Sequence, residues 1–179
     1  MIKTNKTQLK QIEKFLLESN KIEDELSVIA YEDALKAWEY LKMKSFLTPE
    51  VILGVHHFLM GRINPDIAGE WRNCDVYIGG HKKKFVSVQL IEEDVRNFIL
   101  EMGMTPELPK DDLEEFIKQS HIRFEEIHGF VDGNGRTGRL IYLWHRLKMG
   151  LPVKIIHADM ETKGRDGEQG RYYSWFRTS

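Results

Sequence analysis

Residues 128–139 carry the side chains best suited to chemistry and read His-Gly-Phe-Val-Asp-Gly-Asn-Gly-Arg-Thr-Gly-Arg. His128 can act as a base near neutral pH, because a free imidazole titrates at about 6.5. Asp132 offers the hard carboxylate oxygens that bind Mg²⁺ together with phosphate oxygens. Arg136 and Arg139 are three residues apart, so both guanidinium groups should face one side of a helical turn. A base, a metal ligand and two cations at this spacing predict phosphate chemistry.

The middle of this segment is suited to hold an anion. Gly133 and Gly135 let the backbone approach a phosphate, and the helix expected after them directs its free N–H groups to the same place. Asn134 adds a side-chain donor, and Phe130 should anchor the loop to the core. The nucleotide-binding residues expected here are Gly133, Asn134, Gly135, Arg136, Thr137, Gly138 and Arg139.

Other glycine-rich motifs fit this segment less well. Residues 133–138 satisfy G-x-G-x-x-G, but a dinucleotide fold needs a strand before the motif, and residues 111–127 have helical spacing. A Walker A loop needs Lys-Ser/Thr where this chain has Arg139 and Leu140. A calcium loop beginning at Asp132 has non-ligands at its ligand positions.

Apolar spacing predicts the helices that must position this loop. Thr48 and Pro49 suggest a capped start for one of them, with an end near Gly61. The expected helices are one through Leu9, Ile12, Phe15 and Leu16 that frays near Ser19 and Asn20, and others over about 30–43, 49–61, 88–101, 111–127 and 135–148.

The stretch between residues 71 and 88 differs from the rest. The β-prone runs 76–78 and 85–86 lie on either side of Gly79 and Gly80, which predicts a hairpin. The fold class is therefore mainly α, with one small β-hairpin.

Composition limits the class of protein. The 179 residues are 41% hydrophobic and 30% charged, which fits one globular domain. The 26 Lys and Arg against 28 Asp and Glu argue against a nucleic-acid partner. Cys74, the single cysteine, cannot form an internal disulfide, and no apolar run is long enough for a signal peptide or a membrane span. We expect a cytoplasmic protein without a membrane partner.

Residues 128–139 fill every specified position of the Fic signature H-x-F-x-[D/E]-G-N-G-R-x-x-R, so the chain resembles the Fic family. The run from Gly69 to Gly79 is similar to the Fic flap hairpin, and the resemblance extends over about 30–176. It implies the Fic helical bundle with a small β-hairpin flap, and a protein adenylyltransferase that moves AMP from Mg-ATP to a hydroxyl of a target protein. Gly135 stands where the related Doc-type kinases have lysine, which favours AMP transfer over phosphoryl transfer.

The resemblance also assigns roles to these residues. His128 would be the general base for a Ser, Thr or Tyr hydroxyl, and Asp132 would hold Mg²⁺. Asn134 and the amides beside it would hold the α-phosphate, while Arg136 and Arg139 would bind the outer phosphates.

Two outlying groups complete the implied site. Val76, Tyr77 and Ile78 in the flap would align the target segment by strand addition. Tyr172 and Tyr173 would contact the adenine end of ATP.

Residues 19–24 read Ser-Asn-Lys-Ile-Glu-Asp and resemble the Fic inhibitory motif [S/T]-x-x-x-E-[G/N]. Ser19 opens the motif, and Glu23 would pair with Arg139 and so withhold it from the γ-phosphate. Asp24 replaces the usual glycine or asparagine. The resemblance thus divides the chain into an inhibitory segment, 1–29, and a catalytic domain, 30–179.

The expected partners are ATP and a protein substrate, which could be the chain itself, and the sequence permits a homodimer. Three alternatives stay open: removal of AMP with Glu23 activating a water, transfer of another phosphate-linked group, and a binding module without turnover. The other histidines lack metal-ligand spacing, and we expect them at the surface or in the core. His121, about two helical turns before His128, is the one that could approach the site.

Overall fold

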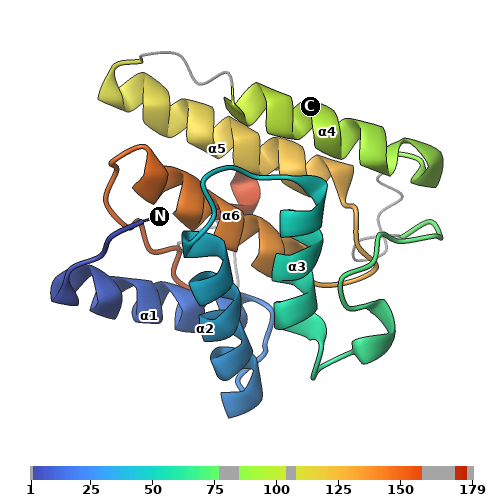
Figure 1. The fold of residues 1–179 in the computed structure, drawn as a ribbon, viewed down its shortest axis with the longest axis horizontal. Coiled ribbons are helices and arrows are strands. Elements are labelled where there is room, and N and C mark those ends of the chain that lie inside the picture. Colours follow the sequence, from blue (N-terminus) through green and yellow to red (C-terminus); the bar gives the residue numbers. More distant parts are fainter. Residues whose placement is uncertain (1, 77–84, 104–107, 159–171, 177–179) are drawn as a thin grey trace.

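The computed structural model describes residues 2–76, 85–103, 108–158 and 172–176, which form helices joined by irregular segments (Figure 1). None of these described residues lies in a strand. The elements are α1 (Lys6–Ile22), α2 (Val28–Lys42), α3 (Pro49–Met60), η1 (Pro65–Ile67), η2 (Val88–Leu90), α4 (Ile91–Gly103), α5 (Lys110–Ile127) and α6 (Asn134–Lys148).

Side-chain caps fix where the first three helices begin. Asn5 and Gln8 form a reciprocal capping box at α1, with side chain to backbone distances of 2.9 and 3.1 Å. Ser27 accepts from the Ala30 amide, so α2 begins at Val28, two residues before the predicted start. Thr48 caps α3 as predicted, and Pro49 follows at its first position. Each cap satisfies an amide that has no partner within its own helix.

Helix α6 crosses the middle of the molecule, with α1, α2 and α3 on one side and α5 on the other (Figure 1). Every residue from Arg136 to Arg146 is buried, as is typical of a helix covered on all sides. The loop that precedes α6 is therefore attached to the most enclosed element of the fold.

Helix α1 packs against α2 and α6 and shares their core. Ile12, Phe15 and Leu16 are each 1% exposed, whereas Leu9, predicted on the same apolar face, is 40% exposed. The buried face continues instead through Ser19 to Ile22, so the prediction that the helix frays at Ser19 is wrong. Helix α1 therefore packs as part of the same core as the segment predicted to be the catalytic domain, and the division near residue 29 stays a prediction.

The predicted hairpin cannot be followed, because residues 77–84, which include Tyr77 and Ile78, lie outside the described residues. Val76 on one side and Phe85 on the other are irregular. In the part of the chain that the structure describes, no helix has both the length and the apolar character required to cross a bilayer.

The packing of α1 predicts a large difference between two nearby apolar side chains. Phe15→Ala should lower the free energy of unfolding by about 3–5 kcal/mol, because it leaves a cavity in the core. Leu17→Ala is the matched control at a position that is 42% exposed. It should change the free energy of unfolding by less than about 0.5 kcal/mol. Urea denaturation measures both, and equal effects would show that α1 is not part of the core.

Candidate active site

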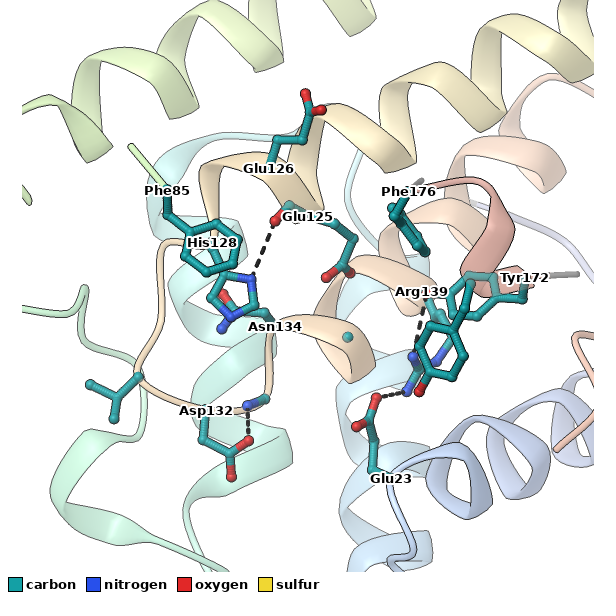
Figure 2. A pocket seen from close by; sticks show the side chains of 14 residues that line it. Glu23, Phe85, Glu125, Glu126, His128, Asp132, Asn134, Arg139, Tyr172 and Phe176 are labelled. Carbon is teal, nitrogen blue, oxygen red and sulfur yellow. Dashed lines mark hydrogen bonds and ion pairs between the residues drawn. The ribbon is translucent and has the colours of Figure 1, made fainter. Parts of the chain in front are cut away.

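A cavity of about 640 Å³ opens above the first turn of α6 (Figure 2). It gathers residues from the end of α1, from α5, from the loop 128–133, from α6 and from the 172–176 segment, together with Phe85. Its lining consists of Glu23, Phe85, Glu125, Glu126, His128, Val131, Asp132, Gly133, Asn134, Gly135, Arg139, Tyr172, Tyr173 and Phe176.

Left-handed backbone at both ends shapes the loop. His128 ends α5 with φ 47° and ψ 55°, a region that residues other than glycine rarely adopt. Gly133 precedes α6 with φ 77°, and a Cβ atom there would lie 2.9 Å from the Met60 sulfur and 3.1 Å from His56 Nε2. Gly133 is therefore required both by its backbone angles and by the side chains beneath it.

His128 has the environment of a neutral base. Its Nδ1 lies 3.2 Å from the Glu125 carbonyl oxygen. That oxygen can only accept, so Nδ1 carries the proton and Nε2 is free to accept one. The ring stacks on Phe85 with centroids 4.2 Å apart. Burial lowers the pKa of His128 below its usual value, and the Arg72 guanidinium contributes in the same direction.

Asn134 and Phe130 tie the loop together. The Asn134 Oδ1 accepts from the Phe130 amide at 2.9 Å, and its Nδ2 donates to the Phe130 carbonyl at 2.8 Å. Phe130 is fully buried and stacks against His56 and Trp71, with centroids 3.8 and 4.8 Å away, so the predicted anchor is confirmed. With both polar atoms of Asn134 engaged, the free amides in the first turn of α6 are the donors best placed for a phosphate, and the catalytic role of Asn134 stays a prediction.

His56 positions the loop, a role that the sequence analysis missed. Its Nδ1 accepts from the Gly69 amide at 2.9 Å, so Nε2 carries the proton and donates to the Asp132 carbonyl at 2.9 Å. Burial lowers the pKa of His56 to about 4. The available signal was its place on α3, where it falls on the buried face with Ile52 and Leu59.

Arg72 is a second positioning residue that was missed. It is 3% exposed, and its guanidinium donates to the His128 carbonyl at 2.7 Å, to the Cys74 carbonyl at 3.0 Å and to the Val86 carbonyl. One side chain thus joins both ends of the flap segment to the residue predicted to be the base.

Asp132 suits Mg²⁺ held mainly by a nucleotide. Its carboxylate is 64% exposed, one oxygen accepts from the Gly133 amide at 2.6 Å, and the other lies 3.7 Å from Arg136. Three or more metal-ligating side chains gather nowhere among the described residues. A single exposed carboxylate fits Mg²⁺, which binds few protein ligands and completes its shell with phosphate oxygens and water.

Arg136 is a buried cation with few partners. It is 6% exposed, one terminal nitrogen lies 3.1 Å from the Met60 sulfur, and its Nε has no partner in the described structure. Such a group favours the arrival of an anion near the first turn of α6.

Arg139 is held from two sides. Its Nη2 donates to Glu23 at 2.6 Å and to the Ser19 carbonyl at 2.9 Å, and its Nε donates to the Ser19 hydroxyl at 2.9 Å. Tyr172 accepts from Nη1 at 3.4 Å. The predicted ion pair of Glu23 and Arg139 is present, and Arg139 is 1% exposed.

The backbone after Glu23 explains the departure at position 24. Asp24 has φ 58°. Glycine and asparagine are best suited to this left-handed conformation, and aspartate also tolerates it. Asp24 therefore meets the same conformational requirement as the usual residue.

The two tyrosines differ from each other. Tyr172 is 3% exposed, and its hydroxyl lies 2.9 Å from His121 Nε2 in addition to its contact with Arg139. Tyr173 is 40% exposed and lines the cavity, so it is the more accessible candidate for the predicted adenine contact. His121 does not line the cavity itself but contacts two residues that do, Tyr172 and Phe176.

Comparison with known proteins points to one family. The profile of the Fic/DOC family matches residues 46–145, more than half of the chain. The chain is 30% identical over 128 residues to the protein adenylyltransferase Fic of Drosophila willistoni, and 29% identical over 124 residues to that of Drosophila erecta. Each match covers 69% of this chain and 24% of the relative, so the chain spans about a quarter of the length of these relatives.

Solved structures show the same fold. Fic-1 from C. elegans superposes with a TM-score of 0.72 at 17% identity, covering 98% of this chain and 61% of that chain. A Fic domain containing signaling protein from Bacteroides thetaiotaomicron gives 0.73 at 18% identity, covering 94% and 72%. The predicted mainly helical Fic fold is confirmed.

The buried state of His56 predicts acid sensitivity. The unfolded chain binds a proton on this histidine near pH 6.5, whereas the folded protein does so only near pH 4, so the unfolded state binds more protons between these values. Acidification from pH 7 to 4.5 should therefore cost up to about 3 kcal/mol of stability through His56. Urea denaturation across this pH range should show that the free energy of unfolding falls less in His56→Gln than in the wild type. In His57→Gln, at the exposed neighbouring position, it should fall as much as in the wild type. Equal slopes in all three proteins would refute the assignment.

Proposed function

The chain belongs to the Fic/DOC family, and from this premise we propose that it is a protein adenylyltransferase that transfers AMP from Mg-ATP to a hydroxyl side chain of a target protein. One observation carries the proposal. A neutral His128 with its Nε2 free faces the same cavity as Asp132, the amides that begin α6, and Arg139. These are the groups that nucleotidyl transfer needs: a base, a metal ligand and donors for phosphate oxygens.

The transfer step follows from these positions. The target hydroxyl gives its proton to His128 Nε2 while its oxygen forms a bond to the α-phosphorus. The bond from that phosphorus to the oxygen bridging the β-phosphate breaks, and pyrophosphate leaves. The free amides of α6 bind the α-phosphate oxygens as negative charge builds on them.

Asp132 would hold Mg²⁺, which supplies neutralisation of phosphate charge in reactions of this type. Its exposed carboxylate can reach a nucleotide in the cavity without moving the loop, because the Gly133 amide and the His56 contact already fix the backbone. Arg136, buried beneath the loop, adds positive charge on the same side.

The Glu23–Arg139 pair supports a second part of the proposal, namely autoinhibition. Four of the five N–H donors of Arg139 already have acceptors: the one on Nε, both on Nη2 and one on Nη1. The acceptors belong to Ser19, Glu23 and Tyr172, so Arg139 has little left to offer an outer phosphate. A productive ATP would have to displace Glu23. Loss of Glu23 should therefore favour the productive pose.

Removal of AMP is the alternative that a specific observation favours. The Glu23 carboxylate lines the same cavity as His128. It could take a proton from water as the water oxygen attacks the phosphorus of a modified target. The bond from the phosphorus to the target oxygen would break, the target oxygen would take the proton that Glu23 had accepted, and AMP and the free target hydroxyl would leave.

We expect transfer of label from α-labelled Mg-ATP to proteins of a cell lysate, or to the enzyme itself, to be weak in the wild type. Glu23→Gly should raise it by about 10-fold or more, because the buried arginine is released. Adding His128→Ala to that variant should abolish the label, because no base remains.

Asp24→Gly is the matched control, since it removes the adjacent acid and suits the left-handed backbone there. It should leave labelling at the wild-type level. If no variant labels any protein although ATP binds, AMP transfer is contradicted, and release of AMP from a modified protein becomes the next activity to measure.

The metal prediction has its own test. Asp132→Asn keeps an oxygen for the Gly133 amide but removes the charge, so in the Glu23→Gly background the Mg²⁺ concentration needed for half-maximal labelling should rise at least about 10-fold. Asp75→Asn, which removes an exposed acid at the edge of the flap segment, should leave the Mg²⁺ dependence unchanged. An identical Mg²⁺ titration in all three proteins would rule out Asp132 as the ligand.

A further inference from the structure

The cavity carries more negative charge than a polyphosphate site should tolerate. Four carboxylates line it, those of Glu23, Glu125, Glu126 and Asp132, against the single guanidinium of Arg139 in the described lining. Under the proposed function, Glu23 leaves when nucleotide binds and Asp132 is neutralised by Mg²⁺. Figure 2 shows the Glu126 carboxylate directed away from His128 and Arg139. Glu125 therefore remains without an assigned role.

Glu125 reaches into the part of the cavity between His128 and Arg139. It lies one turn before His128 on α5, and its carboxyl group projects between His128 and Arg139 over the start of α6 (Figure 2). A Cβ atom at Gly138 would collide with its Oε1. It would also lie 2.8 Å from the buried Phe124 ring, so the close approach of α5 to α6 depends on glycine at that position.

The neutral form of this carboxyl suits its surroundings better than the ionised form. Oε1 is buried and has no hydrogen-bond partner among the described residues, which penalises a charged oxygen. Burial accordingly raises the pKa of Glu125 to about 7, against the opposing effect of Arg139 and with a further increase from Glu23.

The other titratable neighbours do not supply compensating charge. His121 and His128 on α5 both have lowered pKa values because they are buried, so they are neutral at pH 7. Burial raises the pKa of Tyr172, so its hydroxyl keeps its proton. Within the described part of the chain, the hydrogen bonds of Arg139 go to Ser19, Glu23 and Tyr172 and not to Glu125.

We propose that Glu125 belongs to the nucleotide site as a protonated carboxyl, which donates a hydrogen bond to a phosphate oxygen and makes nucleotide binding take up a proton. This inference rests on the proposed function, because it requires ATP in this cavity. An ionised Glu125 would face the phosphates as a like charge in a partly dry site, whereas the acid form turns repulsion into a hydrogen bond.

The pH dependence has a definite sign. In the free wild-type protein Glu125 loses its proton near pH 7, and loss of Glu23 lowers this pKa because the Glu23 charge contributes to the increase. A bound polyphosphate raises the pKa of Glu125. Below about pH 6 the group is already protonated, and binding takes up nothing through it. Between pH 7 and 9 the affinity should fall, by up to about tenfold per pH unit for one coupled proton.

Calorimetry of Mg-ATP binding tests this directly. The parent is Glu23→Gly/His128→Ala, in which the inhibitory carboxylate, transfer and imidazole titration are all absent, so Mg-ATP itself is the probe. At pH 8, the dependence of the binding enthalpy on the ionisation enthalpy of the buffer gives the number of protons taken up per bound nucleotide. We expect this number to lie clearly above zero and to approach about one.

Two further variants assign the proton. With Glu125→Gln added to the parent, binding of Mg-ATP should take up almost no protons. The affinity for Mg-ATP should stay constant from pH 7 to 9, because the amide still donates a hydrogen bond. Glu126→Gln, the matched loss of one acid from the adjacent position, should take up the same number as the parent. Thermal melting confirms that each variant is folded.

The parent alone can overturn the inference, whatever the variants do. Binding without proton uptake would mean that Glu125 stays ionised beside Arg139, and uptake that persists in Glu125→Gln would place the proton elsewhere. Either result leaves the proposed AMP transfer intact if Glu23→Gly still labels proteins. Failure of Mg-ATP to bind the parent would overturn both.

Discussion

A buried positive charge organises this molecule. Arg139 lies on the central helix α6 and is 1% exposed, and an arginine cannot shed its proton to escape the cost of burial. Its donors must therefore be satisfied by groups brought from elsewhere in the chain. Ser19 and Glu23 come from the end of α1, and Tyr172 comes from the far end of the sequence. The same requirement that stabilises the fold thus brings the end of α1 and the segment that contains Tyr172 to the wall of the cavity.

The loop before α6 depends on a second set of buried polar contacts. His56 holds the Asp132 carbonyl, Arg72 holds the His128 carbonyl, and Asn134 closes the loop on Phe130. Each contact is made to backbone, so it sets the path of the chain and leaves the reactive atoms free. His128 keeps its Nε2 free and Asp132 keeps an exposed carboxylate because other side chains hold the loop in place.

Acid groups around the cavity have different environments and therefore different charges. Asp132 is mostly exposed, Glu23 is paired with a cation, and Glu125 is enclosed with an unpartnered oxygen. Burial decides which of them can remain protonated at neutral pH. The number of acidic side chains around the cavity therefore overstates its negative charge.

Local patterns were sufficient for the helices, because caps such as Thr48 and apolar spacing act within a few residues, and the residues 128–139 were sufficient to identify the family. Three features needed the tertiary structure. The roles of His56 and Arg72 depend on carbonyl groups 76 and 56 positions away, and a single residue type carries no record of such a partner. The burial of Ser19 and Tyr172 depends on where α6 places Arg139. The enclosed state of Glu125 depends on how closely α5 approaches Gly138, since the environment that sets its charge is created only when the two helices pack.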